Sequence, residues 1–511
     1  MTSAAGWSAG YVTDIAYMRG YYPEQSPVQL ALAALLMGVQ TDLPGPTDEV
    51  SYLELGCGQG FGATVLAAAN PGWRITAVDF NPAHVAAARR TAAELGLANI
   101  RFLEADLATL PEDPLMAEIP GADVASIHGV WSWVSPEVRA GIVRLLRARV
   151  RPGGLVHVSY NALPGWQGAL LLQRLVREAG RRLAHGSIEQ ARAGLDLVRE
   201  LMAAEADGLA KSARVTDILR RLEKAAPDYI AHEYMNGCWS PCWHADVATD
   251  LAAAKLDYIG SARLLTNFND LMLTEAQRAI ANRFADPLMR ELVVDACNEP
   301  TLRHDIYVRG TRRLSMGARD TALEAVTLAL PMPPEEMVYA VTVPAGRASL
   351  NEAYYRPMIE HLADGPCTVG ELLALPALAG PARNPTEVVG MLLGSGQALA
   401  LARPGAPMNN VSRHLNALTR TRYLNPETMT RPSAMACPAL AGGLPVALAL
   451  FYVAERFAAA GGIDATGIDT EAWARQFAPA DTPAESIAAL AKQMAEEVRR
   501  HGKLWRWLGI A

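Results

Sequence analysis

The residues best suited to chemistry form a short glycine-rich run, Glu54-Leu-Gly56-Cys-Gly58-Gln-Gly60, between a stretch typical of a strand and one typical of a helix. Glycines allow such a run to turn tightly and to approach a ligand closely. The helix that follows presents free backbone N–H groups. The dinucleotide fingerprint GxGxxG would need glycine where Phe61 stands. The run therefore favours a nucleotide-like ligand, with an NAD site as the weaker alternative.

Two further acidic residues follow the next two predicted strands, Asp79 at the end of ITAVD and Asp106 at the end of RFLEAD. An acid after the second strand can accept ribose hydroxyls, and one after the third can take an adenine amino group. S-adenosylmethionine (AdoMet) carries cationic groups and no pyrophosphate, so Glu54 suits it, and an acidic residue before spaced glycines is typical of class I methyltransferases. We predict that AdoMet is the cofactor, with S-adenosylhomocysteine (AdoHcy) as its product. The expected binding residues are Glu54, Gly56, Gly58, Gly60, Asp79, Phe80, Asp106, Leu107 and His128.

Aromatic residues follow the fourth and fifth predicted strands, in the runs SIHGVWSW (126–133) and YNALPGW (160–166). Ligands of open α/β sheets bind outside the carboxyl ends of the strands, and aromatic faces stabilise sulfonium and alkylammonium cations. The candidate catalytic residues are His128, Trp131, Tyr160 and Asn161. Two alternatives stay open: the tryptophans belong to the core, and His128 packs near the adenine instead of relaying a proton. The fourth strand lacks the Asn/Asp-Pro-Pro-aromatic motif, which disfavours planar amides and nucleobase amines as acceptors.

Two other features of the sequence are interpreted as structural. Cys238, Cys242 and His244 are three soft ligands, fewer than the four protein ligands of a structural zinc site, so no metal is expected. Residues 434–454 carry no charge, but Pro438 and Pro445 interrupt them. We therefore expect a loop followed by a buried helix near 446–460, and no membrane span.

Strand and helix patterns alternate along the first part of the chain, which predicts a parallel sheet covered by helices on both faces. The fold class is α/β, a Rossmann-like class I methyltransferase sheet with a helical insertion and a mostly helical C-terminal domain. That last domain has the pattern of a helix-turn-helix or winged-helix unit over 357–401. The strands are expected at Val50–Leu55, Arg74–Val78, Ile100–Glu104, Asp123–Ile127, Leu155–Tyr160, Leu256–Ala262 and Asp305–Arg309.

These patterns divide the chain into four expected parts. Residues 1–30 form an N-terminal segment that caps the cofactor. Residues 31–185 and 244–316 form the AdoMet-binding core, interrupted by a helical insertion over 186–243. Prolines near 331–334 mark a linker before a helical C-terminal domain over 335–511.

Composition limits the classes of partner. The 46 basic and 53 acidic residues among 511 give a formal charge of −7, which disfavours general nucleic-acid binding. Six cysteines are too few for a disulfide framework, and the N-terminus lacks the long apolar core of a signal peptide. We expect a cytoplasmic protein.

Several motifs together resemble one family: YVTDIAYMRGYYPEQSP, ELGCGQG, HGVWSWV, SYNALPGW and HEYMN…AKLDYIGSA. Over about residues 10–315 the chain is similar to bacterial methyltransferases with a methyltransferase regulatory domain, and among these to the rickettsial outer-membrane-protein lysine methyltransferases. The resemblance implies an AdoMet-binding core, a helical middle region, a C-terminal module and protein lysine as the substrate class. It also implies that Tyr21, Tyr22 and Gln25 close over the cofactor.

The expected function is N-methylation of protein lysine side chains by in-line transfer from AdoMet. One alternative is a methyltransferase acting on a small molecule, lipid or natural product. Another is a non-catalytic protein that senses AdoMet. The expected partner is a polypeptide or small-molecule acceptor, with no nucleic acid, and a homodimer is one expected assembly.

Overall fold

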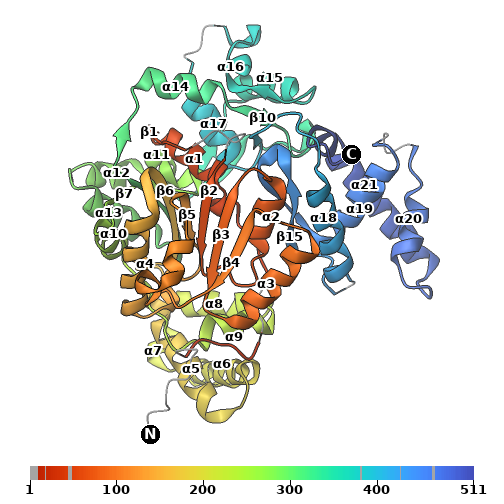
Figure 1. Cartoon of the computed structure of the whole chain (residues 1–511). Coiled ribbons are helices and arrows are strands. Elements are labelled where there is room, and N and C mark those ends of the chain that lie inside the picture. The colour runs from red at the N-terminus through yellow and green to blue at the C-terminus, as the bar shows by residue number, and fades with distance from the viewer. Residues whose placement is uncertain are drawn as a thin grey trace.

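A seven-stranded sheet lies at the centre of the molecule (Figure 1). The structure is a computed structural model, and it describes residues 10–15, 17, 19–43, 49–379, 383–425, 427–462 and 467–511. The strand order is β4-β3-β2-β5-β6-β8-β7. The first five are parallel, and β8 runs antiparallel to both β6 and β7. The bounds are β2 Ser51–Leu55, β3 Arg74–Asp79, β4 Ile100–Glu104, β5 Ala122–Ile127, β6 Val150–Asn161, β7 Leu256–Ser261 and β8 Leu302–Arg309. The predicted Rossmann-like methyltransferase sheet is confirmed.

Alternation along the strands divides the core of this sheet into two layers. Tyr52 of β2 packs with α1 (Pro27–Leu36), α2 (Phe61–Ala69) and α3 (Pro82–Glu94) on one face. Its neighbour Leu53 packs with α4 (Pro136–Arg149) and α10 (His244–Ala252) on the other. Successive side chains of a strand point to opposite faces, so an unbroken apolar run such as β2 requires cover on both sides.

Local signals set the helix that follows β3. The Asn81 side chain accepts a hydrogen bond from the Ala83 N–H, as expected of an N-cap, and Pro82 occupies the first helical position. Gly96 follows the helix with a φ of 65°. Ser135 precedes α4 but makes no capping hydrogen bond through its side chain.

Helices α5 to α9 form a separate group at the bottom of Figure 1, where their apolar faces pack on one another. Their bounds are α5 Leu170–Leu183, α6 Ser187–Ala203, α7 Asp207–Ala210, α8 Ala213–Leu222 and α9 Pro227–Tyr234. Helix α5 thus precedes the boundary expected at 186, and the four-part division of the chain stays a prediction. Between β7 and β8 lie α11 (Asn269–Met272), α12 (Glu275–Ala281) and α13 (Pro287–Asn298).

The C-terminal part begins with a small unit that has the features of a winged helix. A three-stranded antiparallel sheet of order β13-β10-β14 accompanies three helices. The strands are β10 Thr327–Ala329, β13 Cys367–Thr368 and β14 Leu399–Leu401, and the helices are α15 Glu352–Leu362, α16 Val369–Leu373 and α17 Pro385–Gly394. Strand β10 precedes the prolines expected to form a linker, and α14 (Met316–Glu324) packs on α17.

The uncharged segment folds differently from the expected loop. Strands β15 (Pro432–Cys437) and β16 (Gly442–Ala447) form an antiparallel hairpin that packs on α2. The expected buried helix follows as α19 (Leu448–Ala459). The remaining helices are α18 Asn410–Tyr423, α20 Thr470–Phe477 and α21 Ala484–Trp507. In the described part of the chain, no helix combines the length and apolar character needed to cross a bilayer.

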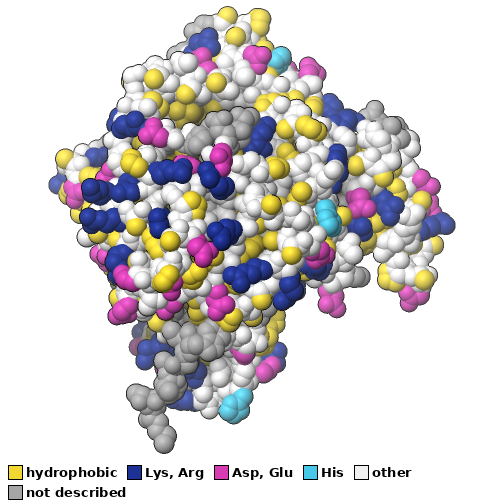
Figure 2. Space-filling view, viewed as in Figure 1, with side chains coloured by type: hydrophobic (Ala, Val, Ile, Leu, Met, Phe, Trp, Pro, Cys, Tyr) yellow, Lys and Arg dark blue, Asp and Glu magenta, His cyan; other side chains and the backbone are white. Residues whose placement is uncertain are grey.

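Basic and acidic side chains are interspersed over the face of the molecule shown in Figure 2. The arginines of α4 have local partners: Arg144 pairs with Glu112 at 2.9 Å, and Arg139 donates to the Trp131 carbonyl at 2.8 Å. Such pairing matches a solvated helix face better than a patch for an acidic partner.

Candidate active site

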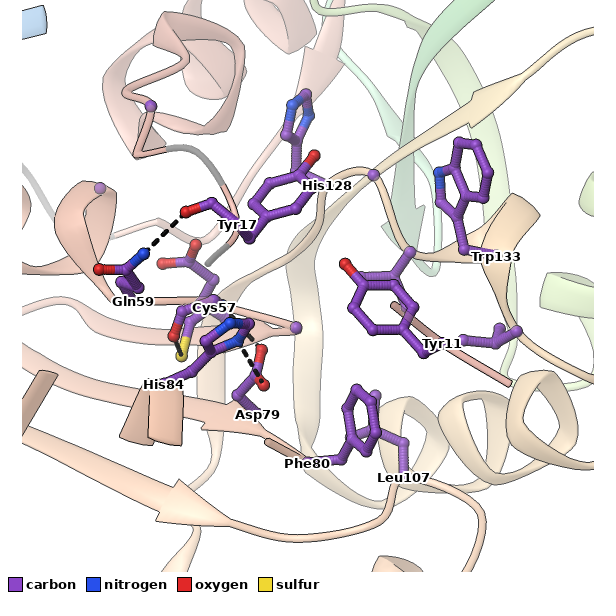
Figure 3. Close-up of a pocket in the computed structure, with 18 of the residues that line it drawn as sticks. Tyr11, Tyr17, Cys57, Gln59, Asp79, Phe80, His84, Leu107, His128 and Trp133 are labelled. Atoms are coloured by element: carbon purple, nitrogen blue, oxygen red, sulfur yellow. Dashed lines mark hydrogen bonds and ion pairs between the residues drawn. The ribbon is translucent and has the colours of Figure 1, made fainter. Parts of the chain in front are cut away.

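A pocket of about 200 Å³ lies at the carboxyl ends of the strands, and Figure 3 shows many of the residues that line it. The chain leaves β2 for β3 on one side of the sheet and returns through β5 on the other, so β2 and β5 flank the topological switch point where such folds bind ligands. Of the twelve residues predicted to bind the cofactor, ten line this pocket: Tyr22, Gln25, Glu54, Gly56, Gly58, Asp79, Phe80, Asp106, Leu107 and His128.

The glycine loop is held in a conformation that only glycine adopts easily. Gly56, Gly58 and Gly60 have φ values of 75°, 55° and 72°. A Cβ on Gly56 would lie 2.2 Å from Cγ2 of Val130. Gly60 lies outside the pocket lining, and a Cβ there would lie 2.4 Å from the Phe102 ring. The first position keeps the floor of the pocket open, and the last permits close packing of α2 on the sheet.

Glu54 presents a buried carboxylate to the pocket. The side chain of Gln25 donates to its Oε1 at 3.5 Å, and Oε2 has no hydrogen-bond partner among the described residues. Burial raises the pKa of Glu54 to about 7. A buried carboxylate with one unused oxygen needs a cationic or hydrogen-bonding partner, and the amino group of AdoMet would supply one.

The second predicted acid, Asp79, also organises the loop. Its Oδ2 accepts from the Gly58 N–H at 2.8 Å and its Oδ1 from the Asn81 N–H at 2.9 Å. His84 lies 3.3 Å from Oδ1. A carboxylate oxygen has two lone pairs, so Oδ2 can still accept from a ribose hydroxyl. Asp106 is exposed at the rim and accepts from the Ala108 N–H at 2.8 Å.

The N-terminal segment covers the pocket. The Tyr22 ring lies 3.9 Å from that of His128, and Gln25 donates to Ser126 at 3.0 Å. Tyr21 turns away and accepts from the Gly443 N–H of β16 at 2.8 Å. Sequence reasoning missed Tyr11 and Tyr17, which also line the pocket. Both lie in an aromatic stretch without periodicity, and that is the one sequence feature that indicates a role in covering the pocket.

Three histidine rings meet at the wall of the pocket: His128 lines it, and His157 and His304 lie behind His128. Nε2 of His157 lies 3.2 Å from Nδ1 of His304, and the His128 Nδ1 lies 2.9 Å from the Ser159 hydroxyl. Burial lowers the pKa of all three, that of His128 to about 4. They are neutral at pH 7, so His128 is a poor proton acceptor there. Among the described residues, these three histidines are the one group whose possible ligand atoms lie close enough together to hold a metal ion. Cys238, Cys242 and His244 do not form such a group.

The other three candidate catalytic residues lie behind the pocket wall. Trp131 is fully buried in the core, and the Tyr160 hydroxyl donates to Asp305 at 2.5 Å inside it. For Trp131, the core alternative is the one the structure supports. Asn161 ends β6, and its side chain donates to Glu233 of α9 at 3.4 Å.

A side cavity of about 20 Å³ adjoins the pocket, and four residues line both: Tyr11, Tyr17, Gly129 and Trp133. Tyr229, His232, Glu233 and Asn236 complete its lining. Figure 3 shows Tyr11 and Trp133 on the same side of the pocket. The cavity thus lies between the end of β5 and α9, and Tyr229 of α9 is 39% exposed. It is wide enough for about one water molecule.

Comparisons with known proteins agree with this geometry. Residues 53–156 match the family model described as methyltransferase domain, and residues 226–309 the one described as predicted methyltransferase regulatory domain. The uncharacterized protein sll1526 of Synechocystis is 33% identical over 366 residues, which are 72% of this chain and 71% of the relative. The uncharacterized protein RP028 of Rickettsia prowazekii is 24% identical over 43% of this chain and 86% of its own length.

One solved structure has the same fold along nearly the whole chain. PKMT2 from Rickettsia typhi, solved in complex with AdoHcy, aligns with a TM-score of 0.72 and 16% identity, over 97% of this chain and 100% of that one. The sheet order, the glycine loop and the matched domains are those of an AdoMet-dependent methyltransferase. The chain therefore belongs to the family of AdoMet-dependent methyltransferases that carry a methyltransferase regulatory domain.

Proposed function

We propose that this methyltransferase transfers the methyl group of AdoMet to the side-chain amine of lysine in a protein. The observation that carries the proposal is the narrow aromatic side cavity that adjoins the cofactor pocket and is lined by the partly exposed Tyr229. A lysine side chain is a flexible four-carbon stem with a compact charged end, and a cavity of this size matches that compact end better than a planar ring or a branched metabolite. The resemblance to rickettsial lysine methyltransferases and the fold shared with PKMT2 support the same acceptor class.

The aromatic wall of the cavity suits an amine acceptor. Tyr11, Tyr17 and Trp133 stand between the pocket and the cavity, with Tyr229 at the outer end. Aromatic faces attract alkylammonium groups and the AdoMet sulfonium alike. Two cations would repel each other in water, and the ring faces lower the cost of bringing them together. The wall also keeps water from the reacting groups.

Within this proposal, Glu54 and Gln25 bind the methionine end of AdoMet, the loop glycines allow its close approach, and Asp79 accepts from the ribose. Phe80 and Leu107 pack on the adenine, beside Asp106. AdoMet supplies an electrophilic methyl group. The protein holds the acceptor amine in line with the methyl–sulfur bond, about 3–3.5 Å from the methyl carbon.

The test is a transfer assay with methyl-labelled AdoMet on cell lysate, comparing the wild type with Gly58→Arg. The substitution fills the pocket at a position with a φ of 55°. We expect label in protein bands for the wild type alone, and mono-, di- or trimethyl-lysine after acid hydrolysis. Label in the extractable small-molecule fraction would contradict the lysine proposal and favour a small-molecule acceptor.

A further inference from the structure

The side cavity contains one carboxylate, that of Glu233 on α9. It lies on the far side of the tyrosines from Glu54 and outside the cofactor pocket itself. Among the described residues, Asn161 is its hydrogen-bond partner and no ion pair involves it. A carboxylate held in an enclosed aromatic slot without a cation is costly unless a ligand supplies the cation.

Asn161 is itself fixed in place. Its backbone N–H donates to the Ser132 hydroxyl at 2.8 Å, and its carbonyl accepts from the Cys242 N–H at 2.9 Å. The amide that contacts Glu233 therefore projects from the end of β6, a rigid central strand. Glu233 comes from a different part of the fold, within the segment that matches the regulatory-domain family model.

We propose that Glu233 is the acceptor-binding carboxylate of this enzyme: it pairs with the alkylammonium group of the incoming lysine and then takes the proton that must leave before methyl transfer. The inference rests on the proposed function and names the group that would perform its first step. Asn161 is the positioning residue that orients the carboxylate. On this account the region matched as a regulatory domain supplies a catalytic residue.

The proposed reaction is a proton transfer followed by a methyl transfer. An N–H bond of the lysine ammonium breaks, its electron pair stays on nitrogen, and the proton forms an O–H bond with Glu233. The nitrogen lone pair then attacks the methyl carbon of AdoMet. The new C–N bond forms as the C–S bond breaks, and the sulfur keeps that electron pair in AdoHcy. The methylated ammonium leaves, and Glu233 returns its proton to solvent.

The surroundings of Glu233 suit a proton acceptor near neutral pH. Burial raises its pKa to about 7, against the lowering effect of the Asn161 hydrogen bond. The titratable groups that face it are phenols, Tyr11 and Tyr17 of the N-terminal segment and Tyr229 and Tyr234 of α9, together with His232. Burial raises the pKa of each phenol, that of Tyr229 to about 12, so they stay neutral.

The other candidates for this role are less suited. The pKa of His128, about 4, leaves it a weaker base than Glu233. The Tyr160 hydroxyl donates a hydrogen bond to Asp305 inside the core, and Tyr160 lines neither the pocket nor the side cavity.

The first test measures binding of Nα-acetyl-lysine amide to the AdoHcy-loaded full chain by calorimetry. Glu233→Gln keeps the size of the side chain and removes the charge, and it should weaken amine binding at least tenfold while AdoHcy binding stays unchanged. Glu223→Gln makes the same chemical change at an exposed position after α8 and serves as the control. Equal amine affinity for wild type and Glu233→Gln would overturn the proposal.

The second test is the pH profile of methyl transfer to a lysine protein found in the lysate assay. At pH 7 Glu233→Gln should be about 100-fold slower or more, the usual size of a general-base contribution. Its rate should then rise about tenfold per pH unit toward 10, because free lysine loses its proton near 10.4, while the wild-type rate levels off above pH 7. Parallel profiles would overturn the proposal.

The outcomes separate the two claims. If the acceptor is not a lysine, the wild type itself neither binds the lysine amide nor labels lysine, and both proposals fail. If only the role of Glu233 is wrong, the wild type labels lysine and Glu233→Gln does so equally well.

Discussion

Two buried carboxylates with raised pKa values, Glu54 and Glu233, line separate parts of the site. Burial is the leading cause in both. Glu54 is bonded to Gln25 and faces the cofactor pocket, whereas Glu233 is bonded to Asn161 and faces the side cavity. In the proposed mechanism one residue type therefore serves two purposes: a countercharge for the bound cofactor, and a group that changes its protonation state in each turnover.

The charge of Glu54 predicts a pH dependence of cofactor affinity. With a pKa of about 7, the side chain is mostly protonated at pH 6 and mostly ionised at pH 7.5. Since the ionised form attracts the ligand amino group, AdoHcy affinity should improve about fivefold or more over this interval. Calorimetric titrations at several pH values measure the change.

Glu54→Gln should bind AdoHcy more weakly and lose this dependence. Glu104→Gln, an exposed position at the end of β4, should keep it. An unchanged pH profile in Glu54→Gln would show that another group titrates with the ligand.

The loop glycines predict a steric effect on binding. Gly56→Ala places a methyl group 2.2 Å from Val130 Cγ2 at a φ of 75°. Overpacking costs about 1–3 kcal/mol, and a left-handed alanine adds about 1–2 kcal/mol. AdoHcy affinity measured by calorimetry should fall at least tenfold.

Gly96→Ala provides the control for that change, because it has a φ of 65° with no atom within 4 Å of the added Cβ. Gly96→Ala therefore has the backbone strain of a left-handed alanine but no steric clash of the added methyl group. If the clash is the cause, Val130→Ala should restore part of the affinity in the double variant. A Gly56→Ala protein that binds normally would mean that the loop shifts freely.

At this scale the sequence predicted the residues that belong to local motifs. Glu54 and Asp79 are fixed by position relative to a strand end, which a single stretch of sequence reveals. Tyr17 and Glu233 line the same cavity but come from segments more than two hundred residues apart in the chain. No local sequence pattern predicts that they lie close together.

Among the elements, β8 is joined to its neighbours by one buried ionic network. Asp305 accepts from Arg303 of the same strand at 2.9 Å, and His244 of α10 lies 2.8 Å from it. Arg303 also pairs with Asp295 of α13 at 2.5 Å. Burial alone would raise the pKa of Asp305, but Arg303 and His244 outweigh it and hold that pKa below the usual range.

This network predicts a large cost for Asp305→Asn. A group with a lowered folded-state pKa contributes stability above its unfolded value near 3.9, and this contribution is lost as the pH falls toward the folded value. Removing one partner of a buried pair costs about 3–5 kcal/mol, so the urea midpoint at pH 7 should fall clearly. Asp257→Asn on neighbouring β7, where the side chain is exposed, should cost less than about 1 kcal/mol. Equal midpoints for the two variants would contradict a stabilising role of the network.

The bounds of β8 depend on this network, whereas the bounds of β2 to β5 follow from the local sequence. The apolar runs of β2 to β5 predicted those strands to within one residue. Strand β8 begins three residues before the expected Asp305, because Arg303 and His304 look like solvent residues until their partners in other elements are known. The prolines and glycines of β15 and β16 are turn residues and favour a loop, whereas the pairing of the two strands and their contact with α2 are tertiary.

At the scale of the molecule, the N-terminal segment connects three parts. Asp14 accepts from the Ser187 N–H at the start of α6 at 2.8 Å. The Tyr17 carbonyl accepts from Gln59 of the glycine loop at 2.7 Å. Arg19 lies over the Tyr423 ring of α18 at 4.0 Å, and Tyr21 contacts β16. Because residues of the same segment line the cofactor pocket, we expect the segment to move when AdoMet replaces AdoHcy.

Movement of the N-terminal segment should be measurable by hydrogen exchange. Tyr21→Phe removes the hydrogen bond from Gly443 without altering the pocket lining, at a cost of about 1 kcal/mol, or about a fivefold larger open population. Hydrogen exchange of residues 19–25 should therefore be faster in this variant, and AdoHcy should slow it in both proteins. Tyr354→Phe, which removes a hydroxyl without a hydrogen-bond partner among the described residues, should exchange there like the wild type. If AdoHcy leaves exchange of 19–25 unchanged in the wild type, the segment is not the cover that moves, and the cofactor enters by another side of the pocket.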